Sequence, residues 1–196
     1  MNVAHVVPIA YPMPAEPLAP VEEPVAALLA DWSWPPNGAA LDRLLSYWPA
    51  VRERVPGARL LLAGRNFPAA RMGQMAGVEV IGPVGDSAEV LGRTALIAFP
   101  CPDSSGPKVK TLEALAHGLP VVTSPAGLEG IGPDDDTLHE MAAADADFAE
   151  RTAALLTHPE ERRRLGALGR RVVAEVHAPE HAAQVRLALF HEAFGV

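Results

Sequence analysis

The sequence predicts an α/β protein with one doubly wound parallel sheet and helices on both of its faces. Three observations support this fold class. From residue 25 onward, short apolar runs alternate with amphipathic stretches of helical length, as in parallel strands joined by crossover helices. Loops rich in glycine, proline and polar residues follow the apolar runs. The 196 residues are enough to bury about 70% of the unfolded chain's surface in one core.

The first 24 residues are expected to lie outside that core. Residues 1–24 contain six prolines, which shorten any helix and remove hydrogen-bond donors from any central strand. We therefore expect an extended arm or linker over residues 1–24 and a folded domain over residues 25–196. The strands that we expect in that domain are Val25–Asp31, Arg59–Gly64, Val78–Gly82, Ala95–Pro100 and Leu119–Thr123, with Leu138–Ala143 as a candidate sixth.

Helices are expected between and after these strands. The segment Pro107–His117 has the clearest boundaries, because a proline lies in its first turn and Gly118 follows its last residue. We expect Asn37 to cap the first helix and Asp86 to cap a short one. The other expected helices are Gly38–Val55, Pro68–Met75, Ser87–Arg93, Asp147–Leu156, Pro159–Val176 and Pro179–Phe194.

Composition and charge exclude several kinds of protein. The one cysteine, Cys101, rules out an internal disulfide and a site with several cysteine ligands, and favours a cytoplasmic setting. A formal charge of −8 disfavours nucleic acid as a partner. We expect neither a signal peptide nor a transmembrane segment, because no apolar run reaches about 18 residues. Asp134–Asp136 run together instead of being spaced as ligands are, so we expect no metal site.

The loops after the expected strands point to one ligand site. In a doubly wound sheet, ligands bind beyond the carboxyl ends of the strands. Five loops converge on that edge of the sheet, and each combines glycine or proline with polar groups. They are Trp32–Asn37, Gly64–Asn66, Gly82–Pro83, Cys101–Gly106 and Ser124–Gly130.

The helix after the fourth strand carries the residues with the clearest chemistry. Lys108 and Lys110 lie in its first turn, where a cation opposes the helix dipole unless an anion is bound there. Free N–H groups, the small residues Ser105 and Gly106 and two ammonium groups together predict a phosphate-binding site. The alternative is two solvated lysines. Glu113, one turn on, either accepts hydrogen bonds from ribose hydroxyls or forms a surface ion pair with Lys110.

The segment Ser105-Gly-Pro-Lys-Val-Lys-Thr-Leu-Glu-Ala-Leu-Ala-His-Gly-Leu-Pro-Val-Val122 resembles the sugar-donor signature of family 4 glycosyltransferases of the GT-B fold. A Gly127-Leu-Glu-Gly130 loop follows it, as in the branch that it most resembles. Trp34–Asn37, Pro56–Arg65 and Val80–Asp86 match further pieces of that pattern in order. The resemblance extends from about residue 25 to the end of the chain.

This resemblance implies a Rossmann-like C-terminal donor domain that binds a nucleoside diphosphate sugar for retaining transfer in polysaccharide synthesis, with no other cofactor. Ser105, Gly106, Lys108 and Lys110 would bind the diphosphate, and Glu113 the ribose. The backbone of Val80, Ile81 and Gly82 would contact the base. Arg65 either reaches a phosphate or is solvated.

The sequence departs from the family pattern in three places. Ser105 stands where the family commonly has a glutamate near the sugar, and the Asp31–Asn37 loop lacks the usual basic residues. A proline-rich arm stands where an acceptor domain is expected. We therefore expect a separate N-terminal partner, or self-association through apolar residues of the last helix such as Phe190 and Phe194. The alternatives are a non-catalytic nucleotide-binding or interaction module and half of a sugar-nucleotide epimerase.

Overall fold

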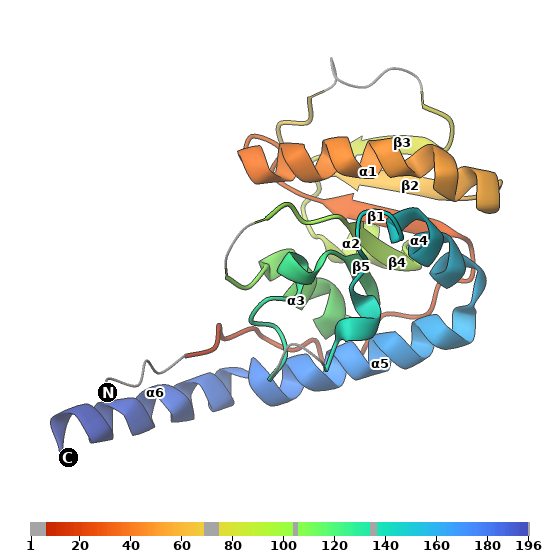
Figure 1. Cartoon of the computed structure of the whole chain (residues 1–196). Helices are drawn as coiled ribbons and strands as arrows, with labels where there is room; N and C mark the ends of the chain where they lie inside the picture. The colour runs from red at the N-terminus through yellow and green to blue at the C-terminus, as the bar shows by residue number, and fades with distance from the viewer. Residues whose placement is uncertain (1–6, 69–74, 104–105, 134–136, 196) are drawn as a thin grey trace.

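Five short apolar segments pair side by side into one parallel sheet in a computed structural model (Figure 1). The structure describes residues 7–68, 75–103, 106–133 and 137–195. The strands are β1 (Val25–Leu29), β2 (Arg59–Ala63), β3 (Val78–Gly82), β4 (Leu96–Phe99) and β5 (Val121–Thr123), in the spatial order β3-β2-β1-β4-β5. This arrangement confirms the predicted α/β class with a Rossmann-like sheet.

Helices cover both faces of the sheet. They are α1 (Pro35–Arg54), α2 (Ala88–Leu91), α3 (Val109–Ala116), α4 (Phe148–Thr157), α5 (Pro159–Val176) and α6 (Pro179–Phe194). The connection through α1 runs from β1 to β2, and the connection through α3 runs from β4 to β5, toward the other end of the sheet. Because both connections are right-handed, α1 and α3 lie on opposite faces of the sheet. Helix α4 packs against α1, and α5 packs against α3.

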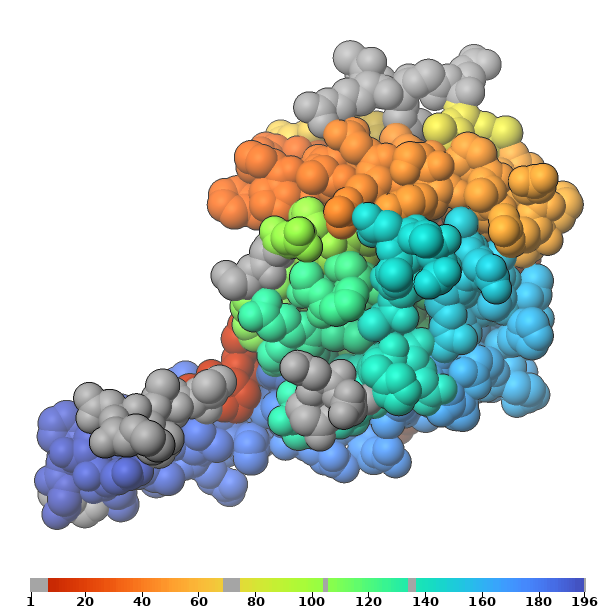
Figure 2. All heavy atoms as spheres, in the orientation of Figure 1, coloured from red at the N-terminus to blue at the C-terminus, as the bar shows by residue number. Residues whose placement is uncertain are grey.

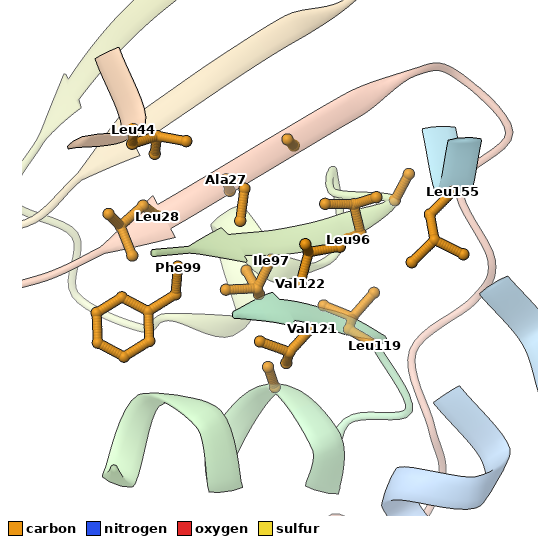
Figure 3. Packing of buried hydrophobic residues seen from close by; sticks show 14 of the residues in the cluster. Ala27, Leu28, Leu44, Leu96, Ile97, Phe99, Leu119, Val121, Val122 and Leu155 are labelled. Atoms are coloured by element: carbon orange, nitrogen blue, oxygen red, sulfur yellow. The ribbon is translucent and has the colours of Figure 1, made fainter. Parts of the chain in front are cut away.

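The core lies on both sides of β1, β4 and β5. Side chains of these strands are almost fully buried, as expected for a parallel sheet covered on both faces. Figure 3 shows Leu44 of α1 near Leu28 of β1, and Leu155 of α4 near Leu96 of β4. Burying one such side chain contributes about 1.5–3 kcal/mol, so these contacts stabilise the packing of α1 and α4 on the sheet.

The N-terminal arm follows the domain instead of standing apart from it. Residues 7–24 contain no helix or strand, yet Tyr11, Met13, Leu18 and Val21 pack against the core. The expectation that the arm contributes nothing to the core is therefore wrong. Side chains of the C-terminal region hold the main chain of the arm. Arg162 donates to the Val21 carbonyl (3.0 Å), and Arg170 donates to the Pro14 and Ala15 carbonyls (2.6 and 3.2 Å). His177 Nδ1 lies 2.9 Å from the Ile9 carbonyl oxygen.

Helix α6 projects from the body of the molecule (Figure 2). Of its residues only Ala182 is buried, and Leu187, Phe190 and Phe194 are 55–69% exposed. The Phe190 and Phe194 rings stack at 5.7 Å between centroids. Among the helices of the described ranges, none is both long and apolar enough to span a lipid bilayer.

Local structure corrects three sequence expectations. Helix α1 begins at Pro35 with Trp34, not Asn37, as its N-cap, because the Pro35-Pro36 pair fixes the backbone of the first turn. The candidate sixth strand forms a 3₁₀ turn at His139–Met141, and one bridge joins Ala142 to Thr123. Asp86 accepts a hydrogen bond from the Ala88 N–H (2.9 Å), but Ser87 is the N-cap of α2. The expected Pro68–Met75 helix and Asp134–Asp136 fall largely or wholly outside the described residues.

Candidate functional site

The start of α3 lies at the point where the sheet reverses its direction of growth. The chain runs outward from β1 to β2 and β3, and then returns to place β4 on the other side of β1. Ligands of doubly wound sheets bind beyond the strand ends at this reversal. Helix α3 is the next helix after the carboxyl end of β4, and its first turn, with Lys108 as N-cap and Lys110 inside it, is at this edge.

Lys110 links α3 to α1 across the reversal point. Its Nζ donates a hydrogen bond to Asn37 Oδ1 (2.5 Å) and lies 4.4 Å from the centroid of the Phe99 ring. Asn37 in turn donates to the carbonyl of Asp31, just after β1 (2.7 Å). Within the described residues, these two groups that contact the ammonium are uncharged.

Burial of Lys110 perturbs its ionisation. Removal of water lowers the pKa of Lys110 to about 8, and a weaker opposing effect comes from Cys101. A buried ammonium with neutral contacts is destabilised, because the protein interior solvates charge poorly. An anion bound beside Lys110 would reverse this shift, so the site favours a negatively charged ligand.

Lys108 and Gly106 form a compact turn just before α3. The Lys108 ammonium donates to the Gly106 carbonyl, and the Gly106 N–H donates to Glu129 Oε2 (3.0 Å). A glutamate therefore occupies the backbone donor that the sequence analysis assigned to the diphosphate. A bound phosphate would have to displace the Glu129 carboxylate to reach the Gly106 N–H. Ser105, assigned to the same group, lies outside the described residues.

The loop that carries Glu129 is packed tightly against the beginning of α3. A Cβ atom on Gly127 would lie 1.9 Å from Thr123 Oγ1, and the Gly127 carbonyl accepts a hydrogen bond from Thr111 (3.1 Å). Gly130 has a φ of 68° and abuts Pro107. These glycines allow the close approach that places Glu129 beside Gly106.

Glu113 faces α2 instead of Lys110. Its Oε1 accepts a hydrogen bond from Ser87 Oγ at the N-terminus of α2 (2.5 Å). Tyr11 of the arm lies near Glu113. Burial of the Tyr11 hydroxyl and, to a lesser extent, the negative charge of Glu113 raise the pKa of Tyr11 to about 12. This geometry disfavours the alternative of a Lys110–Glu113 ion pair and leaves the carboxylate half-buried between α2 and the arm.

The three residues expected near the base form the end of β3. Val80 is 40% exposed, Ile81 is half-buried, and Gly82 has a φ of 81° and accepts a hydrogen bond from the Gly64 N–H (2.7 Å). The short loop that leaves Gly82 leads to Ser87, the partner of Glu113. The structure therefore connects the end of β3 to Glu113 through this loop.

Arg65 already has a carboxylate partner. It is exposed and pairs with Asp31 (3.2 Å), which also accepts from Asn66 and Ser33. These hydrogen bonds, those of Asn66 and Ser33 first, lower the pKa of Asp31 to about 2. Because Asp31 stays ionised, the charge of Arg65 is already balanced.

Sequence reasoning missed the site contacts of three residues. The sequence predicts Asn37 as a helix cap, and it shows Glu129 only as part of a motif and Ser87 only as the start of a helix. Their contacts with Lys110, Gly106 and Glu113 cross 73, 23 and 26 positions of the chain. The one available signal was that Asn37 and Glu129 belong to the motifs Trp34–Asn37 and Gly127–Gly130.

Comparisons with known proteins identify the family and agree with the fold. A family model described as glycosyl transferases group 1 matches residues 23–158. A stretch of 93 residues is 39% identical to the MMP α-(1→4)-mannosyltransferase of Mycolicibacterium hassiacum, covering 45% of this chain and 22% of that protein. The matched region thus spans about a fifth of that curated relative.

Solved structures share the fold at low sequence identity. TarM of S. aureus, solved in complex with UDP, aligns with a TM-score of 0.77 at 15% identity over 92% of this chain and 38% of TarM. Sucrose-phosphate synthase of Thermosynechococcus elongatus gives 0.72 at 18% identity, over 97% and 53% of the two chains. HepE of Anabaena in complex with UDP gives 0.66 at 13%, over 89% and 50%.

Proposed function

The chain belongs to the glycosyl transferases group 1 family, and from that premise we propose that it is a sugar-donor domain, binding a nucleoside diphosphate sugar for glycosyl transfer. The observation that carries this proposal is Lys110: a half-buried ammonium with uncharged contacts, at the reversal point of the sheet and in the first turn of a helix. A diphosphate is an anion of suitable charge for this position. The UDP complexes of TarM and HepE support the same ligand class.

In this proposal the ligand lies along α3 and then toward β3. The diphosphate sits at the N-terminus of α3 against Lys110 and Lys108. Glu113 is one helical turn further on, about 5–6 Å away between Cβ atoms, and exchanges its bond from Ser87 for bonds from ribose hydroxyls. The base then lies toward Val80, Ile81 and Gly82, at the end of the loop that leads to Ser87.

The proposed contribution to catalysis is stabilisation of the leaving group. When the bond from the sugar to the diphosphate breaks, negative charge grows on the departing phosphate oxygen. An ammonium fixed beside that oxygen lowers the barrier, because its position is set before the reaction begins. Lys110 is fixed by Asn37 and Phe99, so we assign this role to Lys110 first and to Lys108 second. We propose retention of configuration at the transferred sugar.

We propose that acceptor binding and the rest of the active site come from a second domain or chain. This chain spans 38–53% of the solved relatives described above. The exposed apolar residues Leu187, Phe190 and Phe194 of α6 offer a surface for such a partner or for a second copy. Transfer activity that appears only when a candidate acceptor-binding half is added would support this division.

The direct test is calorimetric titration of the purified chain with UDP, GDP, ADP and TDP. We expect one of them to bind with a stoichiometry near one and to bind at least about tenfold more weakly to Lys110→Met, a difference of about 1.4 kcal/mol. Arg65→Gln is the matched control, because its charge is already balanced by Asp31. Absence of binding by all four nucleotides, or equal weakening in both variants, would refute the proposed site.

A further inference from the structure

A hollow lies at the opposite edge of the sheet from the Lys110 site. Its volume is about 480 Å³, which is within the range of small-molecule sites. The arm forms one wall through Pro17–Glu22, and α5 forms another from Arg162 to Ala174. Ala95 and Leu119–Pro120, which precede β4 and β5, complete the lining. Since β4 and β5 run parallel, this is the amino edge of the sheet.

Most of the lining is apolar. It consists of backbone and side chains of Pro17, Leu18, Pro20, Val21, Ala95, Leu119, Pro120, Pro159, Ala167 and Ala174. Leu18 and Val21 also pack on the core, and Leu119 is only 5% exposed. The hollow is therefore backed by the packed interior, which favours an apolar ligand body.

Four arginines of α5 line the same hollow: Arg162, Arg163, Arg170 and Arg171. Arg162 and Arg170 donate mainly to backbone carbonyls, which carry no net charge. Within the described part of the chain, the carboxylates that pair with this group are Glu22, 3.4 Å from Arg163 and 3.9 Å from Arg162, and Glu160, 2.6 Å from Arg163.

The local charge balance differs from that of the whole chain. Four guanidinium groups and two carboxylates leave a positive balance at this hollow, whereas the chain carries a formal charge of −8. Arg162 is only 5% exposed, so its charge is poorly screened by water. Arg171 is exposed and lines the hollow. An apolar wall beside unbalanced guanidinium groups selects for a molecule that is both apolar and anionic.

We propose that this hollow binds a small organic anion with an apolar body, such as an aromatic or acyl carboxylate, phosphate or sulfonate. The apolar part contacts Leu18, Val21 and Leu119, and the anionic group meets the guanidinium of Arg171. The site is separate from the proposed nucleotide site, and it joins the arm to α5. A ligand there would also strengthen the attachment of the arm, because it touches both walls.

Fluorescence titration with two matched dyes tests this proposal on the whole chain. 8-Anilinonaphthalene-1-sulfonate is an apolar anion, and N-phenyl-1-naphthylamine has nearly the same rings without the charge. We expect saturable binding of the anion and binding of the neutral dye at least about tenfold weaker. Ala167→Trp, a change at an exposed position of α5 that fills the hollow, should abolish binding of the anion. Arg171→Gln should weaken it about fivefold or more.

Two controls exclude other dye sites. Phe190→Ser on α6 removes exposed apolar surface far from the hollow, and it should leave the affinity for the sulfonate unchanged. Circular dichroism of each variant confirms folding. The proposal fails if the two dyes bind equally, if Ala167→Trp leaves binding intact, if Phe190→Ser abolishes binding, or if a nucleoside diphosphate displaces the sulfonate.

Discussion

The ionisation of Lys110 makes nucleotide binding depend on pH in a calculable way. Its pKa is about 8 in the free protein, against 10.5 for an ordinary lysine. A bound diphosphate stabilises the ammonium and raises the pKa again, so binding takes up a proton wherever the free amine is neutral. Above the pKa of the free protein, affinity should therefore fall roughly tenfold per pH unit. Between about pH 7 and about pH 9 the expected loss is about tenfold.

The assay is calorimetric titration with a nucleotide sugar, whose diphosphate carries no group that titrates in this range, in buffers of different ionisation enthalpy. The wild-type protein should lose affinity as the pH rises and should take up a matching number of protons on binding. Lys108→Met should keep both effects, and Lys110→Met should abolish both. Because Lys108 and Lys110 are the only lysines, reductive ¹³C-methylation with NMR titration also reports the pKa of each directly. An equal pH dependence in Lys110→Met and wild type would refute this reasoning.

Three further outcomes are expected. Glu113→Ala should weaken nucleotide binding at least about fivefold by calorimetry. Ser87→Ala, which removes only the hydrogen bond to Glu113, should leave the affinity unchanged. A larger loss of affinity in Ser87→Ala than in Glu113→Ala would contradict the ribose assignment. Gly166→Ala should lower the free energy of unfolding by about 2 kcal/mol or more in denaturant titration, because its Cβ would lie 2.0 Å from the Gly118 carbonyl oxygen. Gly85→Ala, whose Cβ would have nothing within 4 Å, should leave the free energy of unfolding unchanged. His177→Phe should cost about 1–3 kcal/mol in thermal unfolding, because the fully buried ring lies 2.9 Å from the carbonyls of Ile9 and Ile131; an unchanged midpoint would show that these contacts contribute nothing.

The fold was predictable because its signals are local. Each strand is a short apolar run ended by glycine, proline or polar residues, and the expected Arg59–Gly64 and Val78–Gly82 segments match β2 and β3 within one residue. Helix α3 was bounded correctly to about two residues by Pro107 and Gly118. The Leu138–Ala143 segment failed because a strand needs a neighbour along its length, and only Ala142 finds one.

The candidate site was only partly predictable because its contacts are not local. Chemistry and position identified Lys110, but the sequence alone does not show that Asn37 and Phe99 surround it. It also does not show that Glu129 reaches the Gly106 N–H or that Asp31 pairs with Arg65. Each of these contacts depends on which strand ends become neighbours in the sheet. All the assigned ligand contacts stay predictions: those of Ser105, Gly106, Lys108, Lys110 and Glu113, and those of Val80, Ile81 and Gly82 with the base.

The proline content of the arm has a consequence for the kinds of sequence change that it tolerates. A proline keeps its carbonyl but has no N–H, so a proline-rich segment has more acceptors than donors and can hardly join a sheet. Arg162, Arg170 and His177 supply the complementary excess of donors, and their hydrogen bonds to the arm go to its main-chain carbonyls. Related sequences should therefore keep these three residues while the side chains of Ile9, Pro14 and their neighbours diverge. The three residues bind the backbone of the arm, so many different arm sequences can be bound in the same way.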